Sequence, residues 1–328
     1  MRILICGATG FIGRNIVESL SKVVGIQVTA VYNKKPPFFI KNVEFLEANL
    51  TNVEDVERVV KSQDIVIQAA ANTSGVKDAI ERPYVHVTDN AIMNSLILKS
   101  CYDNHVKKFI FFSCTVMYQT KSQPFLKSPV REMDFDSSNE IYPSYFGVGW
   151  TKVYIEKMCE FYSRLGRTKH CVIRHSNIYG PHDKYDLENS HVFGATINKV
   201  LNKDSNIVSI WGDGSEERDL LYISDLVDSV KKIISSKDKN PFYLFNIGSS
   251  SAISVKDLVF KIVEISGVKD KKIVYEQSEP TVKTSIALDC SKAKLILGWQ
   301  PSVSLEVGIK ETILWYKKNV MNNELEVN

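Results

Sequence analysis

The chain lacks the features that mark membrane proteins and nucleic-acid-binding proteins. No apolar run reaches the roughly 18 residues that a membrane helix needs, and the N-terminus leads into a short apolar run and then glycines, unlike a signal peptide. The formal charge of +3 is small for 328 residues, and no dense Lys/Arg cluster interleaved with aromatic residues is present. We therefore expect neither a membrane nor a nucleic acid as partner.

Paired cysteines are also missing. The six cysteines lie far apart and include no C-x-x-C pair, and most of them fall in apolar runs typical of strands or helices. This pattern predicts buried thiols in a reducing cytosol, and hence a cytoplasmic protein without a metal site. The cysteines are Cys6, Cys101, Cys114, Cys159, Cys171 and Cys290.

Short apolar runs alternate with amphipathic runs throughout the first half of the chain. Near-continuous Ile, Val and Phe content is what a parallel strand covered on both faces requires. Strands and helices that alternate at this spacing predict an α/β fold with a Rossmann-type doubly wound parallel sheet. The predicted strands are Arg2–Cys6, Gln27–Tyr32, Val43–Leu46, Asp64–Gln68, Lys108–Ser113 and His170–Arg174. The predicted helices are Phe11–Val24, Val53–Lys61, Tyr84–Asn104 and Ser144–Arg164.

The pattern changes after Arg174, where loops rich in Gly, Pro, Asp and Asn precede short helices. We expect residues 1–177 to form a dinucleotide-binding domain, with a strand and a helix at about 220–250 returning to it. Residues 178–320 then form a smaller C-terminal substrate-binding lobe, and the polar tail 321–328 is expected to be frayed. The later predicted helices are Asp225–Ser236, Val255–Ser266 and Ser304–Lys318.

A glycine-rich turn follows the first predicted strand. The stretch ILICGATGFIGRN places Gly7, Gly10 and Gly13 between a strand and an amphipathic helix, with Phe11 and Ile12 inside the turn. The first glycine lets the backbone bend, the second lets a pyrophosphate approach amide N–H groups, and the third lets the helix pack closely on the sheet. Strand, glycine triplet and helix together predict dinucleotide binding. A tight turn without a ligand is the alternative.

The choice between NAD and NADP stays open. Selection of NAD usually needs an Asp or Glu at the end of the second strand, where it holds the ribose diol. This strand instead ends in Val31, Tyr32, Asn33, Lys34 and Lys35, without an acid. The two lysines could meet a 2′-phosphate, or they could form a solvated turn.

The motifs together resemble the extended short-chain dehydrogenase/reductase family of nucleotide-sugar enzymes. The resemblance runs over residues 1–317 and is carried by GATGFIGRN, IVIQAAANTSG, KKFIFFSCTVMY, the helix of Lys152 and VIRHSNIYGP. Two further stretches, NIYGPHDKYDLENSHVFGATINKV and IWGDGSEERDLLYISDL, are similar to the GDP-L-fucose synthase branch. This narrower resemblance implies a GDP-linked hexose or heptose as substrate in preference to a UDP- or dTDP-sugar.

The resemblance also implies roles for individual residues. Lys152 would hold the nicotinamide ribose and lower the pKa of a neighbouring hydroxyl, and His191 would act as an acid/base group. Each residue also has an alternative role without catalytic or binding function. Lys152 could be a solvated lysine and His191 a structural or merely sugar-binding histidine; Asn177 could be a turn former, Lys199 or Arg218 a member of a surface ion pair, and Trp211 a buried aromatic. The cofactor residues implied besides the glycine turn are Asn33, Asn49, Leu50, Ala69, Ala70, Ala71 and Lys152. The substrate residues implied are Asn177, Asn189, Val192, Lys199, Trp211, Arg218 and, most weakly matched, Lys283.

Two departures from the family pattern affect proton transfer. Val148 stands four residues before Lys152, where the family has a tyrosine that carries the proton at the sugar oxygen. Cys114 stands at the position of the family's hydroxyl partner, followed by Thr115, and Val116 replaces a cysteine that serves C3/C5 epimerisation. Tyr145, three residues before Val148, is our first choice of substitute proton carrier, because on a helix the two would share a face. Cys114, Thr115, His191 and a bound water are the other candidates.

We expect an NAD(P)-dependent 4-dehydrogenase or 4-reductase of a GDP-sugar, without C3/C5 epimerase activity, that serves surface polysaccharide synthesis. Redox chemistry at one carbon tolerates these two replacements better than a double epimerisation does, because positioning of the cofactor and the sugar supplies much of the rate. A catalytically silent nucleotide-binding protein, an epimerase/reductase like GDP-L-fucose synthase, and a Val148 introduced on purpose are the alternatives. The family also implies a homodimer or a larger homo-oligomer.

Overall fold

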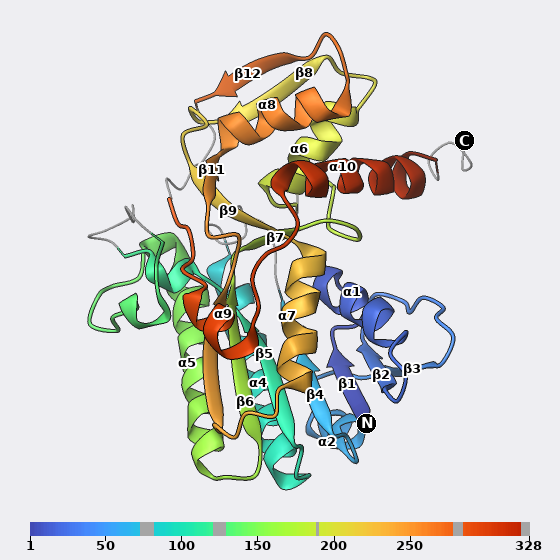
Figure 1. Cartoon of the computed structure of the whole chain (residues 1–328), viewed down its shortest axis with the longest axis vertical. Coiled ribbons are helices and arrows are strands. Elements are labelled where there is room, and N and C mark those ends of the chain that lie inside the picture. Colours follow the sequence, from blue (N-terminus) through green and yellow to red (C-terminus); the bar gives the residue numbers. More distant parts are fainter. Residues whose placement is uncertain (73–81, 121–128, 188–189, 278–284, 323–328) are drawn as a thin grey trace.

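The centre of the computed structural model, which describes residues 1–72, 82–120, 129–187, 190–277 and 285–322, is a seven-stranded sheet (Figure 1). Its strand order is β10-β6-β5-β4-β1-β2-β3, and every neighbouring pair is parallel. The predicted Rossmann-type sheet is therefore confirmed. The strands are β1 (Arg2–Cys6), β2 (Gln27–Tyr32), β3 (Val43–Glu47), β4 (Ile65–Gln68), β5 (Lys108–Ser113), β6 (Lys169–His175) and β10 (Phe242–Ile247).

Helices cover both faces of this sheet. Successive strand residues alternate between faces, so Ile3 and Ile5 pack on one side while Leu4 and Cys6 pack on the other. The first side is covered by α1 (Phe11–Leu20), α7 (Ile223–Ser235) and α9 (Ser291–Leu297). The second side is covered by α2 (Val53–Val60), α4 (Thr88–Asp103) and α5 (Phe146–Arg164). Burial on both faces explains why the strands read as near-continuous apolar runs.

The direction of winding reverses between β1 and β4. From β1 the chain adds β2 and β3 to one side, and from β4 it adds β5, β6 and β10 to the other. In open α/β sheets, ligands bind in the crevice outside the carboxyl ends of the strands at such a reversal. The glycine turn after β1 and the segment after β4 lie at this edge of the sheet.

A second, smaller lobe lies beyond the carboxyl ends of these strands (Figure 1). It has its own apolar core, which includes the buried Tyr179, Phe193 and Ile197. Gly308 leaves room for this core, because an added Cβ there would lie 2.0 Å from the Tyr179 hydroxyl oxygen. The strands are β7 (Asn177–Tyr179), β9 (Glu217–Tyr222) and β11 (Ala252–Ser254) in one sheet, and β8 (Ile207–Trp211) and β12 (Lys272–Glu276) in another. The helices are α6 (Val192–Leu201), α8 (Val255–Ser266) and α10 (Leu305–Tyr316).

Single helical turns connect several of these elements. They are the 3₁₀ turns η1 (Pro83–His86), η2 (Val116–Tyr118), η3 (Glu132–Asp134) and η4 (Pro143–Tyr145), and the π turn η5 (Lys317–Met321). Two of them correct the sequence predictions. The helix predicted at Tyr84–Asn104 is split, since η1 precedes α4, and the helix predicted from Ser144 begins only at Phe146, since η4 precedes α5. Both turns begin with a proline, Pro83 and Pro143.

Two other boundaries differ from the predictions. The first helix ends at Leu20 instead of Val24, and residues 21–25 form turns that end at Gly25, whose φ is +83°. Residues 286–299, which the sequence interpretation assigned to the second lobe, pack into the core beneath the large sheet through Leu288, Ala293 and Trp299. The Trp299 indole N–H donates to the Asp225 carbonyl oxygen at 2.9 Å, which ties this segment to α7.

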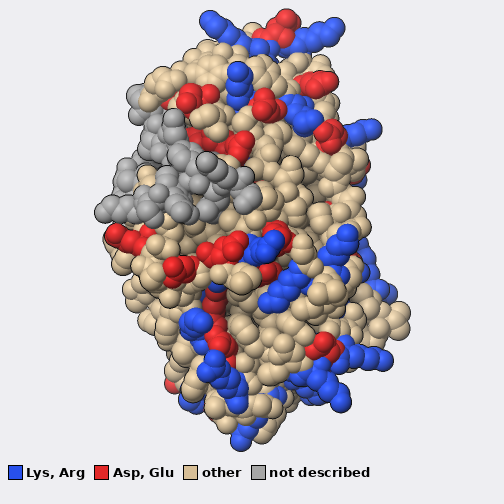
Figure 2. Space-filling model, turned by 60° about the vertical axis from the view of Figure 1, so that its left-hand side comes forward, with Lys and Arg blue, Asp and Glu red and all other residues tan. Residues whose placement is uncertain are grey.

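Charges of both signs are mixed over the surface. Figure 2 shows Lys and Arg interspersed with Asp and Glu over one face of the molecule. This mixture is in keeping with the small net charge of +3. None of the helices within the described ranges is long and apolar enough to cross a membrane.

Candidate active site

The glycine turn after β1 is packed directly against the end of β4. Gly7 has a φ of +73°, and a Cβ added there would lie 2.6 Å from the Ala70 Cα atom. A Cβ added at Gly13 would lie 2.1 Å from the Gly7 carbonyl oxygen. Side chains at these two positions would force β4 or the turn to move, so glycine is required by contact as well as by conformation.

The N-terminus of α1, directly after the glycine turn, is suited to binding an anion. Gly10 is the capping residue, and α1 has neither a side-chain cap nor an acidic residue in its first turn. The first N–H groups of a helix lack intrahelical partners and carry a partial positive charge. These residues therefore fit the pyrophosphate of a dinucleotide, as the glycine pattern predicts.

The other predicted cofactor residues line the same edge, although some side chains are engaged elsewhere. Ala48 N–H donates to the Tyr32 carbonyl oxygen at 3.0 Å, which brings Asn49 to the end of β2 beside the exposed Asn33. The Asn49 side chain is bound to Thr51 in its own loop, and the Leu50 side chain is buried in the core. The half-buried Ala69 and Ala70 and the exposed Ala71 continue from β4 across the turn, and Phe11 and Ile12 pack into the core beneath it.

Lys152 lies where the predicted nicotinamide end would be. Its Nζ donates to the Phe112 carbonyl oxygen at 2.8 Å and lies 4.7 Å from the centre of the Phe111 ring. Burial lowers the pKa of Lys152, while Cys114 and Glu156 act in the opposite direction. The ammonium group is thus held at the carboxyl end of β5, in partly desolvated surroundings where its charge has a strong effect on neighbouring groups.

Cys114 is the titratable neighbour of Lys152 at the end of β5. It is half-buried, whereas the other five cysteines are buried. Burial raises the pKa of the Cys114 thiol, and the charge of Lys152 opposes this rise. The side chain packs against a small apolar cluster formed by Met117, Ile141 and Val153.

Val148 and Val116 contribute no proton carrier to the α5 side of the site. Val148 is half-buried one helical turn before Lys152, and Thr115 is likewise half-buried at the end of β5. Val116 packs near Gly149, since a Cβ added at Gly149 would lie 3.6 Å from its Cγ2 atom. The same added Cβ would lie 2.9 Å from Ile141, so Gly149 allows α5 to approach this loop closely.

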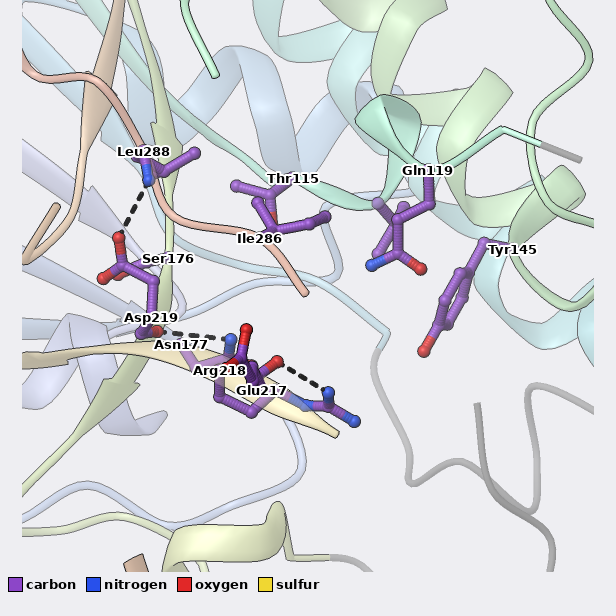
Figure 3. Close-up of a pocket in the computed structure, with 11 residues that line it drawn as sticks. Thr115, Gln119, Tyr145, Ser176, Asn177, Glu217, Arg218, Asp219, Ile286 and Leu288 are labelled. Atoms are coloured by element: carbon purple, nitrogen blue, oxygen red, sulfur yellow. Dashed lines mark hydrogen bonds between the residues drawn. The ribbon is translucent and has the colours of Figure 1, made fainter. Parts of the chain in front are cut away.

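Tyr145 lies in a pocket between the sheet and the second lobe. It is the last residue of η4 and the capping residue of α5, so it is not inside the helix as the sequence suggested. Figure 3 shows its hydroxyl and the Arg218 guanidinium directed into the same space. Burial raises the pKa of Tyr145, and Arg218 opposes this rise. The pocket is lined by Thr115, Val116, Gln119, Tyr145, Ser176, Asn177, Glu217, Arg218, Asp219, Ile286 and Leu288.

The predicted substrate residues that lie in or beside the second lobe fall into two groups, one at the pocket and one around Trp211. Asn177 and Arg218 line the pocket, where Asn177 Nδ2 donates to the Asp219 carbonyl oxygen at 3.3 Å. Lys199 donates to the Ser209 hydroxyl at 2.8 Å, and its Nζ lies 6.0 Å from the centre of the half-exposed Trp211 ring. Lys199 of α6 and Trp211 of β8 therefore form the second group.

His191 stands at the start of α6, where it is the exposed capping residue, and Val192 is the first residue of that helix. Loss of solvent around the ring lowers the pKa of His191, and the charges of Lys184 and Arg218 act in the same direction. Asn189 and Lys283 lie outside the described residues.

Several residues in and near the pocket were not predicted from the sequence, among them Asp219, Gln119 and His175. Asp219 is buried and accepts N–H bonds from Ser249 at 2.7 Å and Leu288 at 3.0 Å, so it joins three segments that are distant in sequence. Gln119 lines the pocket together with Tyr145. His175 is the last residue of β6 and is not among the residues that line the pocket; its place just after the predicted strand His170–Arg174, at the carboxyl edge of the sheet, is the signal that could have found it.

A buried polar network supports the end of α5. Arg174 on β6 makes two bonds to the Glu156 carboxylate, at 3.0 and 2.6 Å, and donates to the Tyr118 hydroxyl at 2.9 Å. Ser113 donates to the same carboxylate at 2.5 Å, and Tyr118 donates to Asn246 at 2.8 Å. Glu156 is one helical turn after Lys152, so the network fixes the helix that carries the lysine against the ends of β5 and β6.

Comparisons with known proteins agree with this arrangement. A family model described as "NAD dependent epimerase/dehydratase family" matches residues 3–248. The chain is 28% identical over 328 residues to GDP-L-fucose synthase of Sinorhizobium fredii, covering 98% of this chain and 97% of that protein. It is 26% identical to GDP-L-colitose synthase of Yersinia pseudotuberculosis, covering 99% of this chain and 100% of that protein.

A solved structure shares the architecture of both lobes. UDP-glucose 4-epimerase of Thermotoga maritima, determined with UDP-glucose, superimposes with a TM-score of 0.84 at 30% sequence identity. The match covers 98% of this chain and 100% of that one. The nucleotide differs between the relatives, since the two sequence relatives are named for GDP-sugars and the solved structure for a UDP-sugar.

Proposed function

The chain belongs to the NAD-dependent epimerase/dehydratase family, and from this premise we propose that it oxidises or reduces C4 of a GDP-linked hexose or heptose. The family and its relatives establish an NAD(P)-dependent enzyme of nucleotide sugars. The finer proposal is a 4-dehydrogenase or 4-reductase of surface polysaccharide synthesis that does not epimerise C3 or C5.

One observation carries the redox proposal. Lys152 is bound to the Phe112 carbonyl oxygen at the carboxyl end of β5, on the same edge of the sheet as the uncapped start of α1. A bound nicotinamide nucleotide would supply or accept a hydride. The residues of this chain then have to hold the cofactor, orient the sugar and move one proton. Lys152 suits the first task, because its ammonium group is fixed beside the proposed nicotinamide site.

The proposed substrate site has a cationic part and an aromatic part. Arg218 lines the pocket, and burial lowers the pKa of its guanidinium. Because the cation is partly removed from water there, a bound anionic group would stabilise it. A sugar diphosphate is such a group. Trp211, with Lys199 beside it, offers a flat surface on which a nucleobase can stack. We assign guanine to this place, in accord with the relatives that act on GDP-sugars.

Loss of C3/C5 epimerisation follows from Val116. Epimerisation beside a keto group needs a group that removes a proton from carbon and one that returns it. Val116 has no ionisable group and packs near Gly149 of α5. His191 is then the one epimerisation residue retained from the family pattern, so the double inversion is not expected.

The test is a substrate panel with purified protein. GDP-sugars and UDP-sugars, with C4 as hydroxyl or ketone, are incubated with oxidised or reduced NAD and NADP while the absorbance at 340 nm is followed. We expect turnover with a GDP-sugar, and transfer of deuterium between cofactor and C4 but no exchange at C3 or C5. Turnover with UDP-sugars alone would contradict the nucleotide assignment. Tight GDP-sugar binding without hydride transfer under any condition would instead favour a catalytically silent protein, to which Val148 also points.

A pair of substitutions identifies the proton carrier that replaces the missing tyrosine. The sequence makes Tyr145 the first choice; we propose Cys114 instead. Cys114 lies directly after β5, where the charge of Lys152 acts on its thiol, whereas the charge of Arg218 acts on Tyr145 in the substrate pocket. Cys114→Ala is expected to lower kcat by about 10²-fold, in the range of a lost general acid or base, and Cys114→Ser to stay within a few-fold. Tyr145→Phe should mainly raise the KM of the sugar nucleotide. If Tyr145→Phe loses kcat and Cys114→Ala does not, the tyrosine is the carrier.

The end of β2 favours NADP over NAD. Lys35 follows β2, and partial burial and the charges of Arg14 and Lys184 lower its pKa; a lysine at this place would suit a 2′-phosphate. We expect Lys35→Ala to weaken NADPH binding about tenfold and NADH binding little, measured by cofactor fluorescence. Lys61→Ala, an exposed lysine after α2, is the control. Equal losses for both cofactors, or none, would leave NAD as the better choice.

The outer face of α4 and α5 suits a homodimer. Ile92 of α4 is 42% exposed, and Tyr154 and Phe161 of α5 are 45% and 53% exposed. Tyr154 and Phe161 are seven residues apart and share one stripe of α5, and the Tyr154 hydroxyl lies 3.2 Å from Ser95 Oγ of α4. We expect light scattering to give twice the 37.1 kDa of one chain, and Phe161→Glu to give monomers. A wild-type monomer would contradict this expectation.

A further inference from the structure

We propose that His175 is a positioning residue for the cofactor, whose Nε2 accepts a hydrogen bond from the carboxamide N–H of the nicotinamide. The inference rests on the proposed redox function, because it requires a nicotinamide at the carboxyl ends of β5 and β6. His175 belongs to none of the site residues predicted from the sequence. A hydrogen bond to the carboxamide would fix which face of the nicotinamide ring is turned to the sugar.

The backbone sets the tautomer of His175. Its Nδ1 lies 2.7 Å from the Ser176 carbonyl oxygen. A carbonyl oxygen can only accept, so Nδ1 carries the hydrogen and Nε2 of the neutral ring presents its lone pair. No described residue hydrogen-bonds to Nε2. The side chain therefore offers an acceptor, and the ligand group that suits it is an N–H or O–H donor.

The ring is placed beside the groups that the redox proposal uses. His175 is the last residue of β6, and its ring lies edge-on to Phe112, with 6.1 Å between ring centres. The carbonyl oxygen of Phe112 is also the acceptor for Lys152. The charges of Lys152 and His191 both act on the His175 ring. The ring is therefore close to the proposed ribose-binding lysine, with which it shares the neighbourhood of Phe112.

The charge state of His175 suits an oxidised nicotinamide. The pKa of His175 is lowered to about 4, mainly by burial; the bond to the Ser176 carbonyl oxygen opposes this fall, and the charges of Lys152 and His191 contribute to it. The ring is therefore neutral at physiological pH. A cationic ring at this place would repel the positive charge of an oxidised nicotinamide, whereas a neutral acceptor stabilises its amide.

The neighbouring His170 makes a useful contrast. Its pKa is also lowered to about 4 by burial, but both of its ring nitrogens are buried without a partner. His170 lies on the same strand as His175, β6, further from the carboxyl edge, and it packs against Phe109 of β5 and Tyr162 of α5. His170 is a core residue, and burial alone thus does not distinguish a site histidine. The distinction lies in an engaged Nδ1, an unengaged Nε2 and the position at the carboxyl edge of the sheet.

The experiment compares a dinucleotide with its 3-acetylpyridine analogue, in which a methyl group replaces the carboxamide NH2. Dissociation constants are measured by calorimetry for the oxidised forms. Wild type is expected to bind the natural dinucleotide about tenfold more tightly than the analogue, the value of one hydrogen bond. His175→Phe keeps an aromatic ring but no acceptor, and should bind both equally. His175→Gln, whose amide oxygen can accept, should keep part of the difference.

The exposed His105 supplies the control, since His105→Phe should leave the tenfold ratio unchanged. Discrimination that survives in His175→Phe, or is absent from wild type, would overturn the inference. If His175→Phe does not fold, the ¹⁵N resonance of Nε2 in the wild-type complexes decides: it should differ between dinucleotide and analogue, and equal shifts would overturn the inference. Wild type that binds no nicotinamide nucleotide at all would refute the proposed function itself.

Discussion

Arg174→Met is expected to lower the free energy of unfolding by about 3–5 kcal/mol, the loss typical of a broken buried ion pair. Arg174 and Glu156 are both buried, and the arginine also holds the Tyr118 hydroxyl. Removing the guanidinium leaves the Glu156 carboxylate in the interior with only Ser113 as a described side-chain donor. The measurement is urea unfolding followed by far-UV circular dichroism.

The pH dependence of this variant tests the cause. Without Arg174, desolvation should raise the folded-state pKa of Glu156 above its unfolded value. A raised folded-state pKa means that the carboxylate costs stability above it, and that the cost disappears as the pH falls below the unfolded value. The deficit of Arg174→Met should therefore be larger at pH 8 than at pH 5.

Two further variants separate the ion pair from other effects of the substitution. The double variant Arg174→Met/Glu156→Leu removes both charges and should regain part of the stability. Lys99→Met, which breaks the exposed Lys99–Asp103 pair, should cause no measurable loss. A double variant less stable than Arg174→Met, or a loss independent of pH, would show that packing of the side chains, not the buried charge, dominates.

The large sheet could be predicted from the sequence because its signals are local. The central strands are apolar runs with buried neighbours on both faces, and the glycine turn reports a contact with the residues that follow β4. Burial on two faces leaves no polar alternation, so the runs stand out from the amphipathic helices. The edge of the sheet at which the cofactor is expected could also be predicted, because the carboxyl ends of parallel strands meet on one side of the sheet.

The contacts that shape the substrate pocket could not be predicted in this way. Asp219 accepts N–H bonds from Ser249 and Leu288, which are 30 and 69 residues away in sequence, and no local pattern reports such a pairing. Tyr145 was placed on a helix because its spacing from Val148 fits one, yet Pro143 begins a 3₁₀ turn that ends at Tyr145. The return of residues 286–299 to the sheet likewise depends on the fit of Trp299 beside α7.

The same limit explains why His175 escaped notice. A histidine at the end of an apolar run has no motif of its own, and the sequence does not say which ring nitrogen is engaged. The 2.7 Å contact with the Ser176 carbonyl oxygen and the proximity of Lys152 distinguish it from His170 five residues earlier. Site residues of this kind depend on the orientation of a side chain, and the sequence pattern fixes only the strand.

Lys152→Met is expected to lower kcat by about 10²–10³-fold, the usual effect of removing one fixed charge from a reacting centre, and to weaken cofactor binding. The same substitution should leave the protein at least as stable. Burial lowers the folded-state pKa of Lys152, so the charged form is less favourable in the folded chain than in the unfolded one at neutral pH. Methionine fills similar space without that cost.

Opposite effects on activity and stability are what distinguish a functional charge from a structural one. Stopped-flow hydride transfer and urea unfolding on the same preparations measure both. Lys157→Met, on the exposed side of the same helix, is the matched control and should change neither. A Lys152→Met variant that unfolds easily would mean that the bond to the Phe112 carbonyl oxygen serves the fold. A variant that keeps its kcat would mean that Lys152, like Val148, takes no part in the reaction. The proposed redox mechanism would then be wrong.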